Sequence, residues 1–293
     1  MEQIYHVLNL GAGVQSTALY LMGMNRDYNL HFDVAIFADT QEEPKAVYAH
    51  LDYLKSLGGP KILTATKGKL GDDLVKGVDG LGKRSASIPA FTAEDHLVRP
   101  GACYHKLPPA PKYGRVLRQC TADYKIQVVE RVIRRELLNL KPRQRMPKGV
   151  RVFQYFGITT DERSRADRAK KRFEKVTWAT PVYPFLDMDW SRESCKEWLK
   201  DRLPYEVPRS ACVFCPYRSN SEWLYLRNTD PEGWQRAVEI DHLLREEGTI
   251  ANRRMNNKLY LHRTCIPLDM VDLRKGKSLY KPLTNECQGM CGV

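Results

Sequence analysis

Near its N-terminus the chain reads IYHVLNL (residues 4–10) followed by GAGVQST (residues 11–17). The first seven residues form an apolar run typical of a buried strand, and apolar side chains at Leu19, Leu21 and Met22 indicate a helix after it. Glycines between a strand and a helix let the backbone approach an anion, and the helix N-terminus offers N–H groups and a positive dipole end. The stretch therefore predicts a strand, a phosphate-binding loop and a helix.

The same rhythm of strand and helix returns further along the chain. Residues 33–37 (DVAIF) and 61–66 (KILTAT) are predicted strands, and Val47, Leu51 and Leu54 between them repeat at helical spacing. Two further strands are predicted over residues 150–158 and 182–185, with an amphipathic helix over residues 121–140. This alternation favours an α/β fold, with a parallel sheet of about five strands flanked by helices and a nucleotide at the carboxyl ends of its strands.

Length and composition agree with a folded, basic protein of two domains. The chain has 293 residues and a formal net charge of +12. Hydrophobic residues make up 42% of it, which is enough to form a core and excludes a wholly disordered chain. We expect a nucleotide-binding α/β domain over residues 1–185 and a helical, cysteine-bearing region over residues 186–293. No apolar run approaches the ~18 residues that cross a bilayer, and Met1-Glu2-Gln3 does not begin a signal segment, so we expect a cytoplasmic protein that does not bind membranes.

Four motifs occur in an order that is similar to a known family. They are the loop Gly11–Thr17, the strand end Phe37-Ala38-Asp39-Thr40, the segment Arg118–Lys125 (RQCTADYK) and the segment Gly157–Arg163 (GITTDER). Together they resemble the PP-loop ATP pyrophosphatases, and most closely the branch of the phosphoadenosine phosphosulfate (PAPS) reductases. Two features depart from the strict loop of that family, namely Ala12 and the missing leading serine.

The resemblance implies a bound ATP with Mg²⁺. The residues that match the family's nucleotide-binding positions are Gly11, Gly13, Gln15, Ser16, Thr17, Asp39, Thr40 and Gly157. Arg118 and Lys125 flank the start of a predicted helix, where both side chains would face a polyphosphate, and Arg163 belongs to the substrate loop. The alternative for Arg118 and Lys125 is two solvated cations on a basic protein.

The cysteines indicate a metal or sulfur site. Cys212 and Cys215 form a Cys-x-x-Cys pair, and the C-terminus carries Cys287 and Cys291. Spacing alone favours a four-thiolate Zn²⁺ site made of these four residues. The resemblance instead implies a 4Fe-4S cluster held by Cys120, Cys212 and Cys215, with Cys287 as the fourth ligand. Glu286-Cys287 also resembles the mobile tail of the reductases, so Cys287 or Cys291 is alternatively a nucleophile, and we include Cys287 among the expected catalytic residues.

Clustered basic residues predict a nucleic-acid partner. They concentrate at residues 131–135, 141–145, 163–172 and 253–254. The expected function is an ATP-dependent enzyme that adenylates an acceptor, releases pyrophosphate and inserts sulfur into tRNA or DNA, as in DNA phosphorothioation, with a sulfur donor such as a cysteine desulfurase. The alternatives are a reductase of adenylyl sulfate or its phosphorylated form, and a zinc-stapled, non-catalytic nucleic-acid-binding module. The sequence leaves the acceptor and the oligomeric state open.

Overall fold

The computed structural model of the protein describes residues 2–78, 86–93, 113–253 and 257–274. The chain forms two compact units that are both discontinuous in sequence. Among the described residues, unit 1 contains those up to Lys67 and Thr121–Ala211, and unit 2 contains those of Gly68–Cys120 and those from Cys212 to Arg274. The expected boundary between residues 185 and 186 differs from this division, because α7 (Arg192–Lys200) packs against α1 (Val14–Asn25) of unit 1.

Unit 1 is built on a five-stranded, all-parallel sheet. Its strands are β1 (Gln3–Asn9), β2 (Val34–Asp39), β3 (Lys61–Thr66), β6 (Val150–Tyr155) and β7 (Ala179–Val182), in the order β3-β2-β1-β6-β7. The expected α/β fold with a parallel sheet of about five strands is thereby confirmed. The last strand ends at Val182, earlier than predicted, because α6 (Pro184–Asp187) begins at a proline, which cannot donate to a strand ladder.

The order in which the chain adds strands to the sheet reverses at the central strand β1. Leu8 of β1 is in register with Ala35 of β2 on one side and with Tyr155 of β6 on the other. The chain after β1 builds β2 and β3 on the first side, whereas β6 and β7 lie on the second. The loops that leave β1 and β6 therefore separate at their carboxyl ends, where open α/β sheets bind their ligands.

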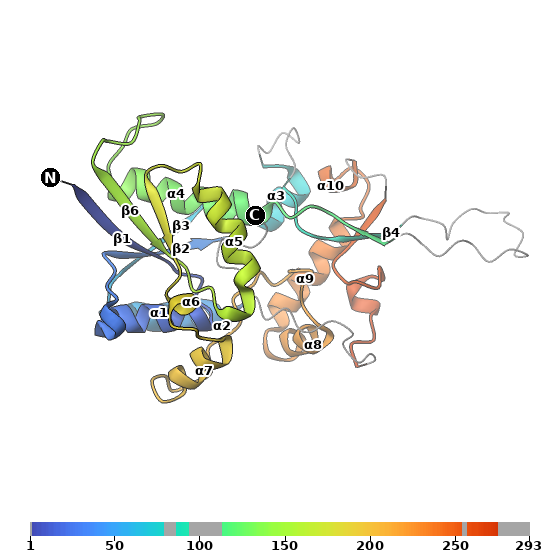
Figure 1. The fold of residues 1–293 in the computed structure, drawn as a ribbon. Helices are drawn as coiled ribbons and strands as arrows, with labels where there is room; N and C mark the ends of the chain where they lie inside the picture. Colours follow the sequence, from blue (N-terminus) through green and yellow to red (C-terminus); the bar gives the residue numbers. More distant parts are fainter. Residues whose placement is uncertain (1, 79–85, 94–112, 254–256, 275–293) are drawn as a thin grey trace, which may run out of the picture. The chain divides into compact units, whose positions relative to one another are not determined.

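Helices cover both faces of this sheet, as Figure 1 shows for α1, α2 and α4. On one face α1, α2 (Lys45–Ser56) and α7 pack over Leu8 and Phe37. On the other face α4 (Gln127–Val132) packs over Val7 and Ile36. Because successive strand residues point to opposite faces, the unbroken apolar runs found in the sequence are what a sheet covered on both sides requires.

The helix predicted over residues 121–140 is interrupted by wider turns. A π-helical segment at Ala122–Ile126 precedes α4, and another at Ile133–Leu137 follows it. Such turns occur often at functional sites. The first of them contains Lys125. After β6, a short 3-10 helix at Thr160–Glu162 leads into α5 (Arg163–Phe173).

Unit 2 combines a small antiparallel sheet with helices. Its strands are β4 (Phe91–Ala93), β5 (Tyr113–Arg115) and β8 (Lys258–Tyr260), in the order β5-β4-β8, and its helices are α3 (Leu70–Lys76), α8 (Asn220–Thr229), α9 (Pro231–Leu243) and α10 (Ile250–Arg253). Trp223 is fully buried in its core. The sequence did not predict the strands of this sheet, since three residues are too few to show an alternation. Across both units, no helix in the described ranges has the length and apolarity needed to span a bilayer.

Candidate functional site

The predicted phosphate loop closes around the hydroxyl of Ser16. The backbone nitrogens of Gly11 and Gly13 donate to Ser16 Oγ at 3.1 and 3.2 Å, and Ser16 is fully buried in the first turn of α1. Between the two glycines Ala12 has a φ of +55°, a left-handed conformation that costs a non-glycine residue roughly 1–2 kcal/mol. Two N–H groups of the loop are thus occupied by Ser16 Oγ, and the loop leads directly into a helix N-terminus, the kind of position that binds anions.

The loop is tied to the segment that follows β6. Gln15 Nε2 donates to Glu162 Oε2 at 3.0 Å, and Glu162 also forms an ion pair with Arg165 of α5. All three side chains are buried. These contacts hold together the segments that follow β1 and β6, where the strand order reverses.

Two buried polar atoms near the loop lack a hydrogen-bond partner among the described residues. They are Gln15 Oε1 and Thr159 Oγ1. An unsatisfied buried polar group costs about 1–3 kcal/mol, so each atom has a strong tendency to bind a ligand or water. Thr159 follows Gly157 after β6, and Gln15 is the second residue of α1, so both atoms come from the segments that follow the carboxyl ends of β6 and β1.

A buried ion pair lies beyond the end of β2. Lys125 Nζ is 3.3 Å from Glu43 Oε1, and Ser210 Oγ donates to Glu43 Oε2 at 3.3 Å. The side chains of Lys125 and Glu43 are 5% and 0% exposed, so neither charge is screened by bulk water. The predicted catalytic residue Lys125 is thus placed within unit 1 by a carboxylate that the sequence analysis did not single out.

Asp39 shapes the loop that leaves β2. Its Oδ1 accepts hydrogen bonds from the backbone nitrogen of Gln41 at 2.7 Å and from the hydroxyl of Tyr48 at 2.9 Å. Burial and the Asp39 carboxylate both raise the pKa of Tyr48 above its ordinary value, which keeps this hydroxyl protonated as a donor. The predicted residue Thr40 is buried beside Asp39.

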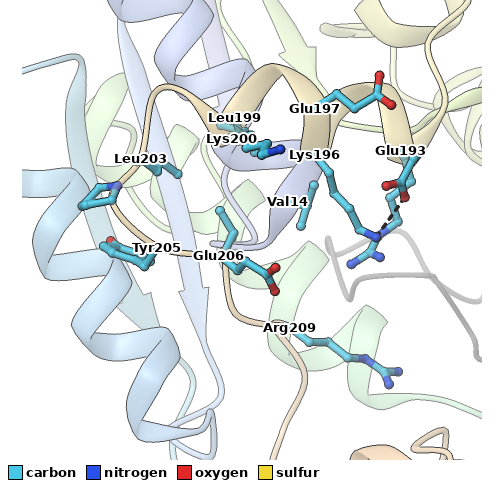
Figure 2. Close-up of a pocket in the computed structure, with 13 residues that line it drawn as sticks. Val14, Glu193, Lys196, Glu197, Leu199, Lys200, Leu203, Tyr205, Glu206 and Arg209 are labelled. Carbon is cyan, nitrogen blue, oxygen red and sulfur yellow. Dashed lines mark hydrogen bonds and ion pairs between the residues drawn. The ribbon is translucent and has the colours of Figure 1, made fainter.

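A cavity of about 870 Å³ adjoins the first residue of α1, Val14 (Figure 2). Its walls come from α7 and from the segment that follows it. Four cations line it, Arg192, Lys196, Lys200 and Arg209, together with three carboxylates, Glu193, Glu197 and Glu206. Lys196 Nζ is paired with Glu193 Oε2 at 2.9 Å. The cavity is therefore a large, mixed-charge space next to the phosphate loop, within unit 1.

Comparison with known proteins identified no family for this chain. No family model, curated protein or solved structure matches the chain. Its relation to the PP-loop ATP pyrophosphatases therefore stays a prediction, carried by the motifs and by the arrangement of unit 1.

Three of the predicted site residues, Arg118, Cys120 and Cys215, lie near Tyr217 in unit 2. The guanidinium groups of Arg115 and Arg118 lie 5.4 and 5.3 Å from the centre of the Tyr217 ring. Burial raises the pKa of Tyr217, the two arginines lower it, and the thiols of Cys215 and Cys120 raise it again. Arg118 therefore lies in a cationic and aromatic cluster of unit 2 near two of the expected metal ligands, whereas Lys125 belongs to unit 1.

Cys212 and Cys215 lie in one turn of unit 2. The backbone nitrogen of Cys215 donates to the carbonyl of Cys212 at 2.9 Å, so the Cys-x-x-Cys pair forms a turn. Within the described residues, no three or more His, Cys, Asp or Glu side chains are grouped to hold a metal ion. The proposed fourth ligand Cys287, and Cys291, lie outside the described residues. A closed four-thiolate site therefore needs a ligand from beyond them.

Arg163, the third predicted catalytic cation, begins α5 at the surface. Its guanidinium pairs with Asp189 at 2.9 Å, and both side chains are more than half exposed. The sequence analysis did not single out five buried residues of this site, although three of them lie in segments that it named: Glu43, His50, Thr159, Glu162 and Arg165. Their common feature is burial of a polar side chain, which depends on tertiary packing and leaves no periodic signal in the sequence.

Proposed function

We propose that the protein is an ATP-dependent enzyme that adenylates an acceptor in nucleic acid, releases pyrophosphate and inserts sulfur into the acceptor. ATP with Mg²⁺ would bind at the loop Gly11–Thr17. The observation that carries this proposal is the presence of two buried polar atoms without a hydrogen-bond partner among the described residues, Gln15 Oε1 and Thr159 Oγ1. They lie in the segments that follow β1 and β6, where the strand order reverses. A nucleotide offers both hydrogen-bond donors and acceptors to such atoms.

Residues of unit 1 could stabilise the negative charge that develops during the reaction. Attack of an acceptor oxygen on the α-phosphorus forms one P–O bond, and breakage of the bond to the β-phosphate releases pyrophosphate with additional negative charge. The positive dipole end of α1 and the ammonium group of Lys125 could stabilise this charge. Lys125 is held at 3.3 Å from Glu43, and this buried ion pair fixes the position of its ammonium group within unit 1.

The acceptor side of the proposal rests on two different sets of cations. Arg143 and Arg145 are exposed just before β6 begins at Val150, so they lie at the amino-terminal edge of the sheet, opposite the phosphate loop. Arg192, Lys196 and Lys200 follow one another every fourth residue along α7, beside the cavity at Val14. We assign general nucleic-acid affinity to the first set and placement of the acceptor to the second.

Sulfur delivery is proposed from the cysteines of unit 2. Cys120, Cys212 and Cys215 are soft ligands suited to a 4Fe-4S cluster, which would supply sulfur chemistry when bound, and Zn²⁺ is the alternative occupant. Support comes from the turn that brings Cys212 and Cys215 together and from the electrostatic effect of both Cys120 and Cys215 on Tyr217. A separate sulfur donor such as a cysteine desulfurase would complete the reaction.

Nucleotide binding tests the proposal directly. Wild-type protein should bind ATP with a dissociation constant in the micromolar to millimolar range, measured by calorimetry. The double substitution Ser16→Ala with Gly13→Val should abolish binding, and Thr159→Val should weaken it, while the exposed-site control Ser164→Ala should leave it unchanged. Release of pyrophosphate in the presence of tRNA or DNA would then separate this function from reduction of adenylyl sulfate. Unchanged ATP binding in folded Ser16/Gly13 and Thr159 variants would disprove the assignment of the loop.

A further inference from the structure

A buried chain of hydrogen bonds runs from the phosphate-loop helix to the wall of the cavity. Thr17 Oγ1 lies 2.8 Å from His50 Nε2, and His50 Nδ1 lies 2.9 Å from the hydroxyl of Tyr205. Thr17 and His50 are 0% and 1% exposed, so water does not compete for these bonds. The three residues come from α1, from α2 and from the segment after α7.

Each end of the chain lies at a functional part of unit 1. Thr17 is in the first turn of α1, where its backbone nitrogen donates to the carbonyl of Gly13 at 2.9 Å. Tyr205 is 40% exposed and lines the cavity together with Val14, as Figure 2 shows. Its ring also packs edge-on against His50 and Tyr53. The chain therefore connects the helix that begins the phosphate loop with a side chain that a cavity ligand would contact.

The imidazole is suited to hold both hydroxyls in one orientation. Burial lowers the pKa of His50 to about 4, so the ring is neutral near pH 7. A neutral imidazole has one donor and one acceptor nitrogen, so one of the two hydroxyls must donate to it and the other must accept from it. Rotation of either hydroxyl away from the ring would leave a buried ring nitrogen unsatisfied, which opposes movement of the first turn of α1.

We propose that His50 is a positioning residue that holds the first turn of α1, and with it the phosphate loop, in its binding conformation through Thr17 and Tyr205. The inference rests on the proposed nucleotide function, although His50 itself would not touch the nucleotide. It acts as a second support for the loop, independent of the contact between Gln15 and Glu162.

The test combines nucleotide affinity with the local stability of α1. The full chain would be compared with His50→Phe, Thr17→Val, their double variant, and Tyr205→Phe. The matched control is Tyr53→Phe, which removes a neighbouring hydroxyl outside the chain. Calorimetry would give the dissociation constant for ATP, and amide hydrogen exchange would give the protection of residues 17–20 without any nucleotide.

We expect about tenfold weaker ATP binding in His50→Phe and in Thr17→Val, with no further loss in the double variant because both remove the same support. Tyr205→Phe should weaken binding about threefold and provides the test if His50→Phe does not fold. Exchange over residues 17–20 should accelerate in these variants and stay unchanged in Tyr53→Phe.

Two results would overturn the inference. The first is unchanged exchange over residues 17–20 in the His50 and Tyr205 variants. The second is a loss of ATP affinity in the double variant that equals the product of the losses in His50→Phe and in Thr17→Val. If wild-type protein bound no ATP while exchange accelerated as expected, the proposed function would fail and the positioning role would stand.

Discussion

The side-chain amide of Gln15 donates to the carboxylate of Glu162 at 3.0 Å, although 147 positions separate the two residues in the chain. This bond joins the loop after β1 to the loop after β6, at the edge of the sheet where we propose that ATP binds. Glu162 also balances the charge of Arg165, which is buried with it. One carboxylate thus supports both the loop geometry and the stability of unit 1.

Removing that carboxylate should be costly. In Glu162→Leu the buried guanidinium of Arg165 loses its ion pair, and we expect a loss of about 3–5 kcal/mol in the free energy of unfolding. The matched control is Glu193→Leu, which breaks the exposed pair with Lys196 and should cost less than about 1 kcal/mol. Urea denaturation followed by circular dichroism measures both. Equal effects of the two substitutions would contradict the role of Glu162.

Stability should fall as the solution becomes mildly acidic. Burial lowers the pKa of His50 and that of His262 from 6.5 to about 4, so between these values the unfolded chain binds more protons than the folded one. The free energy of unfolding should therefore be fully retained above about pH 6.5 and decline toward pH 4, by up to about 3 kcal/mol for each histidine. Denaturation at a series of pH values measures the decline, which should be shallower in His50→Phe. An identical slope in that variant would exclude His50 as its source.

Nucleic-acid binding should depend steeply on salt. Replacing Arg143, Arg145, Lys170 and Lys171 with alanine should flatten the dependence of the binding constant on salt, by up to ~0.9 in the double-logarithmic slope for each lost DNA phosphate contact. Lys196→Ala with Lys200→Ala should instead lower transfer of the adenylyl group to the acceptor, with a smaller change in slope. Filter binding of tRNA and DNA from low to high salt measures the slopes. Binding that ignores salt, or no binding at low salt, would favour a small-molecule substrate.

Metal content should separate the sulfur chemistry from a structural zinc site. We expect a brown protein on anaerobic purification, with iron and sulfide, and loss of colour in Cys120→Ala, Cys212→Ala and Cys215→Ala. Cys195→Ala is the control, because this buried thiol packs in the core of unit 1. Cys287→Ala should lose colour if Cys287 is a ligand and keep colour but lose turnover if it is the nucleophile. Colourless protein with one zinc, retained without Cys120, would favour the non-catalytic module.

Lys67 should be a destabilising residue in the ligand-free protein. Its ammonium nitrogen is buried without a hydrogen-bond partner among the described residues, and it lies 5.1 Å from the centre of the Tyr124 ring. Lys67→Met keeps the length of the side chain and removes the buried amine, so we expect thermal stability to increase by about 1 kcal/mol. The exposed neighbour Lys69→Met should change stability little. A clear loss of stability in Lys67→Met would show that contact with Tyr124 outweighs the desolvation of the amine.

Local sequence patterns predict the elements of unit 1 and their class of fold. The apolar run over residues 34–37 is buried on both faces, as a parallel sheet covered on both sides requires, and the glycines at residues 11 and 13 indicate where the first strand meets its helix. These signals are local, so neighbouring residues suffice to show them. The motifs also selected Gln15, Ser16 and Lys125 before their contacts were known.

Which side chains meet in unit 1 depends on its tertiary packing. The pairing of Gln15 with Glu162, of Lys125 with Glu43 and of Thr17 with His50 joins residues between 33 and 147 positions apart. No periodicity specifies such pairs, because they follow from how strands order themselves in the sheet and from which polar groups burial forces to find a partner. The division into two discontinuous units has the same origin. It depends on the packing of α7 against α1 and on the pairing of β4 with β8, which bring distant segments of the chain together.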